Sequence, residues 1–463
     1  MSFKEFINLF VKAVREKDID YTKGSINQAL ILLSIPMILE MLMESLFAIV
    51  DVFLVARISN NAVATVGITE GILMLVESVA LGVAMAATAM ISRRIGEKNI
   101  DAASKVAGQA IILTAIISVV TGTLAFIYAE DILLLMGGDK SLIEEGKSYT
   151  RIMLSFNFIL MFLFVFNGIF RASGSPAYAM RTLIYANLLN IILDPILIFG
   201  LGPISGMGVT GAAVATCIGR GFGIAYQLYI LFSAGFILKL SWRHFRIHWD
   251  TISRLFRLTL GGAGQFLIST ASWIFLIRIL ASFGSVVLAG YTIGIRIIIF
   301  SILPSWGLAN ATATLVGQNL GAGQPERAET TVWKAGFYNV FFLLSLTLIF
   351  VLFGEPICSI FSTDPEVIKE ASLCLMVICL GNVFFSYQMI VTQAFNGAGD
   401  TTTPTILSFI FMWLVQIPLS YTLAVSLNMG SLGVYIAIGI SSLLIALAAI
   451  FLFRRGKWKN VVV

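Results

Sequence analysis

The sequence predicts an all-α integral membrane protein whose twelve transmembrane helices form two six-helix bundles related by a parallel internal repeat. The first observation is composition: of 463 residues, 58% are hydrophobic and 12% are charged, whereas soluble domains carry about 25% charged residues. The second is a series of apolar stretches, each long enough to cross a bilayer. The third is a set of short motifs that recur 225 residues apart. Together they exclude a disordered chain, a nucleic-acid-binding protein and an ordinary cytosolic enzyme.

Residues 1–25 precede the first apolar stretch and are predicted to form a cytoplasmic amphipathic segment. Basic residues alternate there with apolar residues at helical spacing, the apolar ones being Phe3, Phe6, Ile7, Phe10, Val11 and Val14. This pattern is typical of a helix that lies on the inner leaflet of a membrane. A plain solvated tail is the alternative.

Twelve spans follow, and each needs about 20 mainly apolar residues. The N-terminal bundle covers residues 26–235, a basic cytoplasmic linker covers 236–251, the C-terminal bundle covers 252–455, and residues 456–463 form a cytoplasmic tail. Several stretches exceed the thickness of a bilayer, so we expect them to tilt or kink. The predicted spans are approximately residues 28–57, 62–92, 101–128, 146–170, 177–201, 207–235, 252–283, 287–317, 327–353, 367–396, 402–427 and 432–453.

The orientation of the chain follows from its basic residues. Most of the 30 Lys and Arg residues fall in the N-terminal segment, the central linker, the tail and the connections on the same side. Because cytoplasmic connections are enriched in Lys and Arg, both termini are predicted to be cytoplasmic, which an even number of spans requires. We therefore expect a multi-pass protein of the plasma membrane.

The internal repeat relates the two bundles. The motif Gly-Val-Ala-Met-Ala begins at Gly82 and Gly-Leu-Ala-Asn-Ala begins at Gly307. The same offset relates three more pairs, which are Gly96 and Gly321, Phe170 and Phe395, and Gly174 and Gly399. Six spans in each half give the halves the same orientation, so the repeat is parallel. Two facing bundles predict a central cleft and alternating access, with a static scaffold or channel as the alternative.

Carboxylates at membrane depth are costly and mark functional sites, and the two halves share them unequally. In the C-terminal bundle, the acidic residues fall in loops or at helix ends. We therefore place ion coupling in the N-terminal bundle. Its intramembrane acids are Glu40, Glu44 and Asp51 in the first span, Glu70 and Glu77 in the second, and Asp194 in the fifth.

The first span carries three of these acids on one face, because Glu40, Glu44 and Asp51 are separated by four and seven residues. That face is expected to turn away from lipid. Pro36 cannot donate the helical hydrogen bond at its position and predisposes the span to bend. The candidates for the lining of a substrate cleft are Glu40, Glu44, Glu77 and Asn187.

A candidate cation site combines residues of three spans. Asn190 and Asp194 lie one turn apart in the fifth span, at a depth similar to that of Asp51, and Thr216 of the sixth span reaches the same level. Carboxylate, amide and hydroxyl oxygens suit a bound Na⁺. They equally suit a proton shared by two acids, since close like charges raise one pKa. A protonated pair that only packs helices is the third possibility.

The chain resembles the multidrug and toxic compound extrusion (MATE) family over its whole length. The features that carry the resemblance are Pro36 with Asp51 in AIVDVFLVARIS, the run VGQNLGAG, the links RASGSP and NGAGDTTTP, and NIILDPILIFG followed by GAAVAT. Within the family it is most similar to the DinF branch. That resemblance implies a cation site at Asp51, Asn190, Asp194 and Thr216, and a bending proline at Pro36.

Two further points concern the branches of the family. The NorM branch is marked by carboxylates in spans seven and ten, and none occurs near Ser269–Thr270 or Phe385–Ser386. Glu44 stands where a neutral polar residue is expected. This departure leaves open an additional titrating group or an altered choice of substrate.

The resemblance implies a monomeric secondary active multidrug efflux transporter, which exchanges cationic amphipathic compounds for H⁺ or Na⁺ and needs no cofactor. A flippase of lipid-linked or other amphipathic substrates, from the wider superfamily, is the alternative. It would need basic residues in the cavity, and we expect basic residues within helices only at Arg278 and Arg296 of the second half. An enzyme is not expected, because HExxH, GxSxG and Walker A motifs are absent from the sequence.

Overall fold

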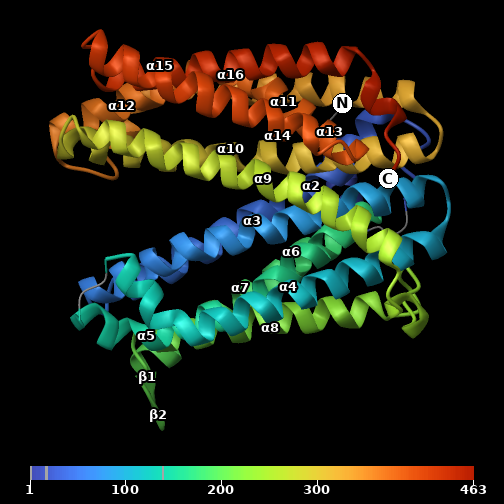
Figure 1. Cartoon of the computed structure of the whole chain (residues 1–463), viewed down its shortest axis with the longest axis horizontal. Helices are drawn as coiled ribbons and strands as arrows, with labels where there is room; N and C mark the ends of the chain where they lie inside the picture. Colours follow the sequence, from blue (N-terminus) through green and yellow to red (C-terminus); the bar gives the residue numbers. More distant parts are fainter. Residues whose placement is uncertain (1–2, 16–18, 138–139) are drawn as a thin grey trace.

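The computed structural model describes residues 3–15, 19–137 and 140–463 and consists almost entirely of helices. Two groups of long helices diverge like the arms of a V (Figure 1). One arm holds α2 to α8 and the other holds α9 to α16. The arms meet at the end of the molecule where both chain termini lie, which we call the closed end. The opposite end, where the arms separate, is the open end.

The N-terminal half begins with a helix outside the bundle and ends with a short β-hairpin and a final helix. Its elements are α1 (Phe3–Arg15), α2 (Ile26–Val55), α3 (Asn60–Gly96), α4 (Ile100–Leu135), α5 (Lys140–Ser155), α6 (Asn157–Ala172), α7 (Ala177–Phe199), β1 (Gly200–Leu201), β2 (Ile204–Ser205) and α8 (Val209–Leu231). The two strands pair antiparallel, with Gly200 opposite Ser205.

The C-terminal half follows a linker that contains the short 3-10 helix η1 (Trp242–Phe245). One of its spans runs through α14, η2, α15 and η3, of which η2 and η3 are π-helical. The elements are α9 (Trp249–Ala281), α10 (Ser285–Gly321), α11 (Pro325–Cys358), α12 (Pro365–Leu380), α13 (Asn382–Ala398), α14 (Thr402–Ser408), η2 (Phe409–Gln416), α15 (Ile417–Tyr421), η3 (Thr422–Ser426), α16 (Ser431–Arg454) and η4 (Lys457–Asn460).

The predicted spans correspond to segments of the structure. Within the described residues, ten helical segments are long and apolar enough to cross a membrane, and α12 with α13 forms an eleventh that bends by 57°. With α2, which has 30 residues and packs between α7 and α10, these make the twelve predicted segments. The chain is therefore a multi-pass membrane protein.

Two predicted spans each consist of two α-helices that meet at a break. The fourth consists of α5 and α6, which meet at Phe156, and the tenth consists of α12 and α13, which meet at Gly381. The residue after each break has the same role. Asn157 Nδ2 donates to Thr121 Oγ1 at 3.0 Å, and Asn382 Nδ2 donates to Thr347 Oγ1 at 3.2 Å. A buried amide therefore ties each bent span to the preceding one.

The repeat is visible in the elements themselves. Helices α3 and α10 both have 37 residues and begin 225 positions apart, and α5 and α12 are related by the same offset. The halves also meet symmetrically at the closed end. A Cβ added to Gly96 would lie 2.0 Å from the carbonyl oxygen of Gln318, and one added to Gly321 would lie 2.0 Å from that of Arg93. The 225-residue offset also relates Arg93 to Gln318, so the prediction of a parallel repeat agrees with the packing.

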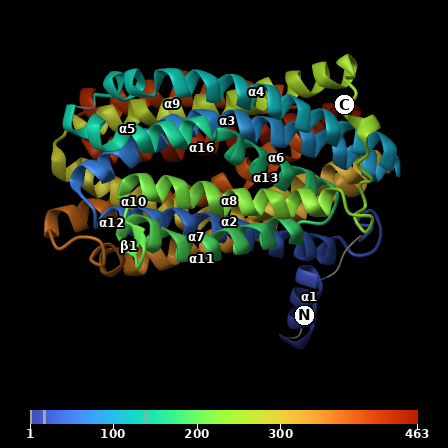
Figure 2. The same cartoon turned by 90° about the horizontal axis from the view of Figure 1, so that it is seen from below.

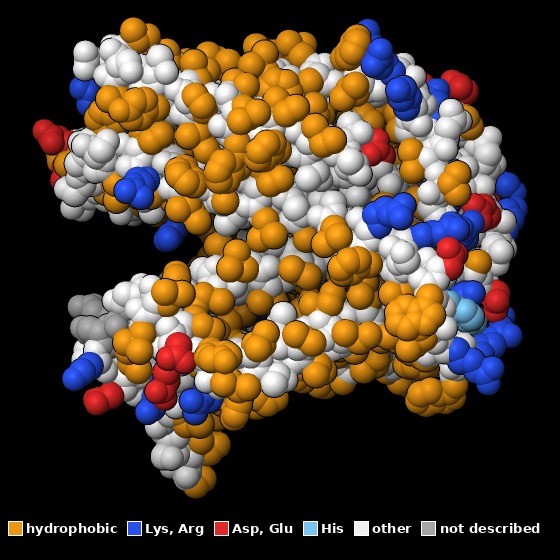
Figure 3. Space-filling model, in the orientation of Figure 1, with side chains coloured by type: hydrophobic (Ala, Val, Ile, Leu, Met, Phe, Trp, Pro, Cys, Tyr) orange, Lys and Arg blue, Asp and Glu red, His pale blue; other side chains and the backbone are white. Residues whose placement is uncertain are grey.

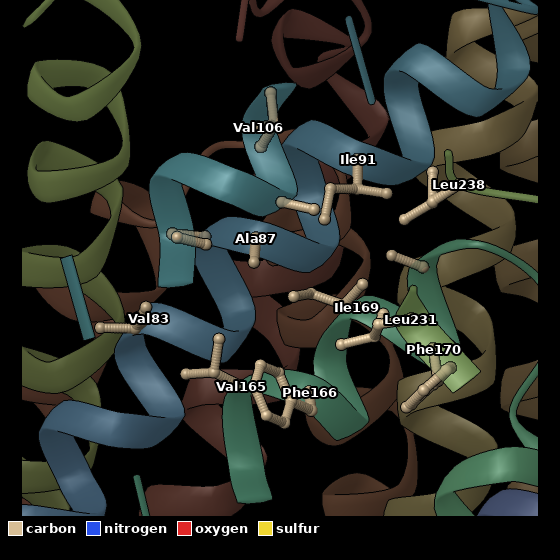
Figure 4. Packing of buried hydrophobic residues seen from close by; sticks show 14 of the residues in the cluster. Val83, Ala87, Ile91, Val106, Val165, Phe166, Ile169, Phe170, Leu231 and Leu238 are labelled. Carbon is tan, nitrogen blue, oxygen red and sulfur yellow. The ribbon is translucent and has the colours of Figure 1, made fainter. Parts of the chain in front are cut away.

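The core of the N-terminal half is built where α3, α4, α6 and α8 meet (Figure 4). Small and large side chains alternate there, among them Val83, Ala87 and Ile91 of α3 and Val165 and Phe166 of α6. The first part of α2 packs instead against α10 and α11, in the core of the C-terminal half. Helix α2 therefore belongs to one bundle by sequence and contributes to the cores of both.

The predicted amphipathic segment contains α1, which projects away from the bundle at the closed end (Figure 2). Its axis does not follow the long axes of the spans, and Ile7, Phe10 and Val11 are exposed. Arg181 of α7 donates to the Val14 carbonyl oxygen at 2.7 Å, which holds the end of α1 against the bundle. Residues 1–2 and 16–18 of the predicted segment lie outside the described residues.

The predicted tail packs against both halves. Trp458 is fully buried and its ring stacks on that of Phe453, with centroids 4.6 Å apart. The Glu329 carboxylate of α11 lies 2.6 Å from Lys459 Nζ and raises the pKa of Lys459. On the other half, Arg94 Nη2 donates to the Val463 carbonyl oxygen at 2.7 Å. The tail therefore closes over the junction of the two bundles.

Candidate functional site

A cavity of about 440 Å³ lies between the two halves. Residues of α2, α3, α6, α9, α10 and α13 line it, and most of them are apolar, such as Met85, Phe266 and Trp306. Its charged residues are Glu44, Glu77 and Arg171. Figure 3 shows the space between the arms as a hollow at the open end, while many Lys and Arg side chains gather at the closed end.

A second cavity of about 350 Å³ lies beside the first, mainly within the N-terminal half. The two cavities share lining residues, among them Glu44, Glu77 and Leu303. The second one is far richer in charge. Its ionisable lining residues are Glu44, Asp51, Glu70, Glu77, Tyr149 and Arg220.

The four residues of the predicted cation site come from α2, α7 and α8. Asp51 and Thr216 line the second cavity, whereas Asn190 and Asp194 are fully buried behind it. The charge of Asp51 acts on Asp194, so the two carboxylates are near each other. Each of the four residues has a buried polar atom without a hydrogen-bond partner among the described residues. These atoms are Asp51 Oδ1, Asn190 Oδ1 and Nδ2, Asp194 Oδ1 and Oδ2, and Thr216 Oγ1.

Unpartnered buried polar atoms are rare, because each costs about 1–3 kcal/mol. At this site, five of the six atoms are oxygens. Oxygen donors are what Na⁺ or another hard cation prefers, and a carboxylate oxygen can instead take a proton. The donor set therefore fits either ion.

Two of the four predicted cleft residues, Glu40 and Asn187, are absent from the linings of both cavities. Glu40 is 1% exposed and its Oε1 accepts a hydrogen bond from Arg171 Nη1 at 2.9 Å. Asn187 Nδ2 donates to the carbonyl oxygens of Met43 and Leu183, at 3.0 and 2.8 Å. Both side chains point towards neighbouring helices, where they join α2 to α6 and α7.

The other two predicted cleft residues line both cavities but differ in their partners. Glu44 Oε1 accepts a hydrogen bond from Arg220 Nη2 at 2.9 Å. No described side chain forms a hydrogen bond or an ion pair with Glu77. Glu77 is therefore the carboxylate of the shared wall that a ligand can reach without displacing a protein cation.

Pro36 lies inside α2, which continues as one helix from Ile26 to Val55. On the next turn, the backbone of Ile38 lies so close to Gly307 of α10 that a Cβ on this glycine would be 2.7 Å from the Ile38 nitrogen. The proline is thus placed where α2 passes from contact with the C-terminal half to the acidic part of the N-terminal half.

Two arginines at the cavities were missed by the sequence prediction, which was wrong to expect basic residues within helices only at Arg278 and Arg296. Arg171 belongs to the RASGSP link, beside a turn, yet it lines the cavity between the halves. Arg220 lies in the middle of α8. The sequence could have indicated Arg220, because a lone Arg in an apolar span marks a functional candidate.

Glu70 was also left out of the predicted cleft. It lines the second cavity from α3, and the charges of Arg220 and Arg296 both act on it. Arg296 belongs to α10 of the other half and is exposed, as is Arg278. The cavity wall thus carries an acid within electrostatic reach of a base in the other half.

The chain is similar in sequence and in structure to known proteins. The family model described as MatE matches residues 36–196 and 263–422, one segment in each half. A protein of Thermotoga maritima named probable multidrug resistance protein NorM is 26% identical over 94% of each chain. A protein of Shewanella oneidensis named FAD transporter is 25% identical over 93% of this chain and 95% of that protein.

A solved structure, described as the outward-facing conformation of a multidrug resistance MATE family transporter of the MOP superfamily, superposes with a TM-score of 0.89. It is 25% identical in sequence, and the match covers 96% of this chain and 100% of that one.

Proposed function

Because this chain belongs to the MatE family, we propose that it is a secondary active multidrug efflux transporter, which exports cationic amphipathic compounds in exchange for H⁺ or Na⁺. The observation that carries this proposal is that several carboxylates lining the cavities are not paired with a basic residue. Arg171 is paired with Glu40 and Arg220 with Glu44. The lining carboxylates without an ion pair among the described residues are Asp51, Glu70 and Glu77. A largely apolar space with unpaired acids suits a lipophilic cation.

The proposed coupling uses the site predicted for a DinF-like member of the family, at Asp51, Asn190, Asp194 and Thr216. A cationic substrate and a coupling ion both gain from ionised carboxylates, and opposite charges attract strongly where water is scarce. Uptake of H⁺ or Na⁺ neutralises the carboxylates and removes that attraction, so the substrate is released. Bending of α2 at Pro36 is the accompanying conformational step.

We place the protein in the plasma membrane, with the closed end on the cytoplasmic side. The basic residues at the closed end favour this choice (Figure 3). Both termini are then cytoplasmic, and the open end faces outward. The cavities lie within one chain, so we expect the monomer to be the working unit and no cofactor to be needed.

The decisive experiment measures dye transport by purified protein in proteoliposomes, with a pH gradient and a Na⁺ gradient imposed separately. We expect one of the gradients to drive accumulation of a cationic dye. Asp51→Asn removes the ionisable group at the coupling site and should abolish transport without loss of expression. Asp250→Asn, on the exposed first turn of α9, is the matched control and should transport normally. Full transport by Asp51→Asn would remove Asp51 from the coupling role.

Transport of an anionic or lipid-linked amphipathic substrate is the second candidate. The observation that favours it is the presence of Arg171 and Arg220 at the cavities, and one similar protein is named FAD transporter. Thermal stability of the purified protein distinguishes the candidates. Stabilisation by a cationic dye supports multidrug export, whereas stabilisation by a flavin nucleotide or a lipid-linked precursor, with no effect of the dye, supports the alternative.

A further inference from the structure

Arg220 stands at the junction of the two cavities. Its Nη2 lies 2.9 Å from Glu44 Oε1, and its guanidinium group lies over the ring of Phe47, 4.5 Å from the centroid. It is one helical turn from Thr216 of the proposed cation site. Glu44, its partner, lines both cavities. One side chain thus connects the substrate cavity with the cation site.

The hydrogen-bonding capacity of this guanidinium is not used up. Arg220 Nε is buried and has no hydrogen-bond partner among the described residues. A guanidinium has five N–H donors, so a second carboxylate can be accommodated. Asp51, Glu70 and Glu77 line the same cavity as Arg220. Other groups that face Asp51 or its neighbours are Tyr149 of α5, Asp194 of α7, Cys217 of α8 and Arg296 of α10.

The repeat shows that this pair is not part of the shared scaffold. The position equivalent to Glu44 in the second half is Ser269. When α8 and α16 are aligned by Gly208 and Gly430, which precede them with similar positive φ angles of 57° and 60°, Arg220 corresponds to Ser442. Neither serine is charged, so the fold itself does not require an ion pair here.

We propose that Arg220 is a tethered cation that transmits the state of Asp51 to the substrate carboxylate Glu44. When Asp51 is ionised, the guanidinium moves to Asp51 and leaves Glu44 to a cationic substrate. When Asp51 takes up a proton or Na⁺, the guanidinium returns to Glu44 and displaces that substrate. The arrangement seen in the structure, with Arg220 on Glu44, is then the releasing state. This inference rests on the proposed exchange of cations.

The test is a double-mutant cycle read by equilibrium binding rather than by transport. The probe is radiolabelled tetraphenylphosphonium, a permanent lipophilic cation, and the protein is full-length in nanodiscs. Asp51→Asn imitates the neutralised site, so Arg220 stays on Glu44 and binding should weaken by about 5- to 150-fold, the usual range of coupling between sites. Adding Arg220→Gln to Asp51→Asn removes the competitor, and binding should recover despite the second substitution.

Two independent residues would give effects that add. Additive losses, or an Asp51→Asn variant that binds as tightly as the wild type, would overturn the role of Arg220. Arg220→Lys keeps the charge and should leave the double variant weak, which separates loss of charge from loss of folding. Arg278→Gln removes an exposed arginine outside both cavities and should bind normally. Failure of the wild type to bind the probe at all would instead reject the cationic substrate class of the proposed function.

Discussion

The two halves of the molecule place a polar pair at the same point of the same helix contact but build it from different side chains. In the N-terminal half, Glu40 of α2 forms an ion pair with Arg171 of α6 at 2.9 Å. In the C-terminal half, the residues 225 positions later are Gln265 of α9 and Asn396 of α13. Gln265 Nε2 donates to Asn396 Oδ1 at 3.0 Å. One contact is ionic, and its counterpart is a pair of neutral amides.

The difference separates acids that tie helices together from acids that we propose to serve transport. A contact that works with amides in one half does not need charge in the other, so Glu40 and Arg171 act as a tie between helices. The remaining acids have uncharged counterparts in the second half. Asp51 corresponds to Leu276 and Glu77 to Ile302. The fold of the second half therefore forms without acids at these positions, and we propose that their cost at membrane depth reflects function.

The strongest way to break this comparison is to disturb the ionic tie. Arg171→Asn leaves Glu40 buried without its partner, and removal of one member of a buried pair costs about 3–5 kcal/mol. The double variant Glu40→Gln with Arg171→Asn copies the amide pair of the other half. It should recover most of that stability and should still transport. Thermal unfolding in detergent and dye transport measure the two outcomes.

A double variant that stays as unstable as the single one would show that the two contacts are not equivalent. A stable double variant without transport would return Glu40 or Arg171 to the functional site.

The glycine contacts at the closed end provide a second test of the comparison, with a smaller expected loss of stability. A methyl group on Gly96 or on Gly321 would collide with the backbone of the other half, and overpacking costs about 1–3 kcal/mol. Because the two contacts are symmetric, Gly96→Ala and Gly321→Ala should lower the unfolding temperature by similar amounts. Gly71→Ala is the matched control, since a Cβ there meets no atom within 4 Å. Markedly unequal effects would mean that the repeat does not extend to the energetics of the closed end.

The amides at the two bent spans give the smallest effect. Asn157→Ala and Asn382→Ala each remove one buried hydrogen bond between helices, which costs about 1 kcal/mol. We expect two similar, small decreases in thermal stability. Ser345→Ala provides the baseline, because that exposed hydroxyl bonds only to the carbonyl oxygen of Phe341 in its own helix. A loss at one asparagine alone would assign the bend of that half to other contacts.

The fold could be predicted from the sequence because its elements recur along the chain. Apolar length predicts each span, and pairs such as Gly96 and Gly321 predict the repeat that relates the two halves. The sequence could not show which face of a helix meets which neighbour. Spacing placed Glu40, Glu44 and Asp51 on one face of α2, yet the first two contact different arginines on different helices. Arg171 shows a related limit, because it is buried beside a turn and proximity to a turn in sequence does not imply exposure.

The closed end can be described as a subunit interface contained in one chain. The contact between Gly96 and residue 318 is repeated between Gly321 and residue 93, so the same surface is used on both sides. That reciprocity is the defining property of an isologous interface in a symmetric homodimer. Each half therefore carries a self-complementary surface, and two copies of either half have the contacts needed to pair with one another. Because the linker joins the two bundles in one chain, each half always meets its own partner half. The remaining surfaces of the two halves can therefore differ in charge.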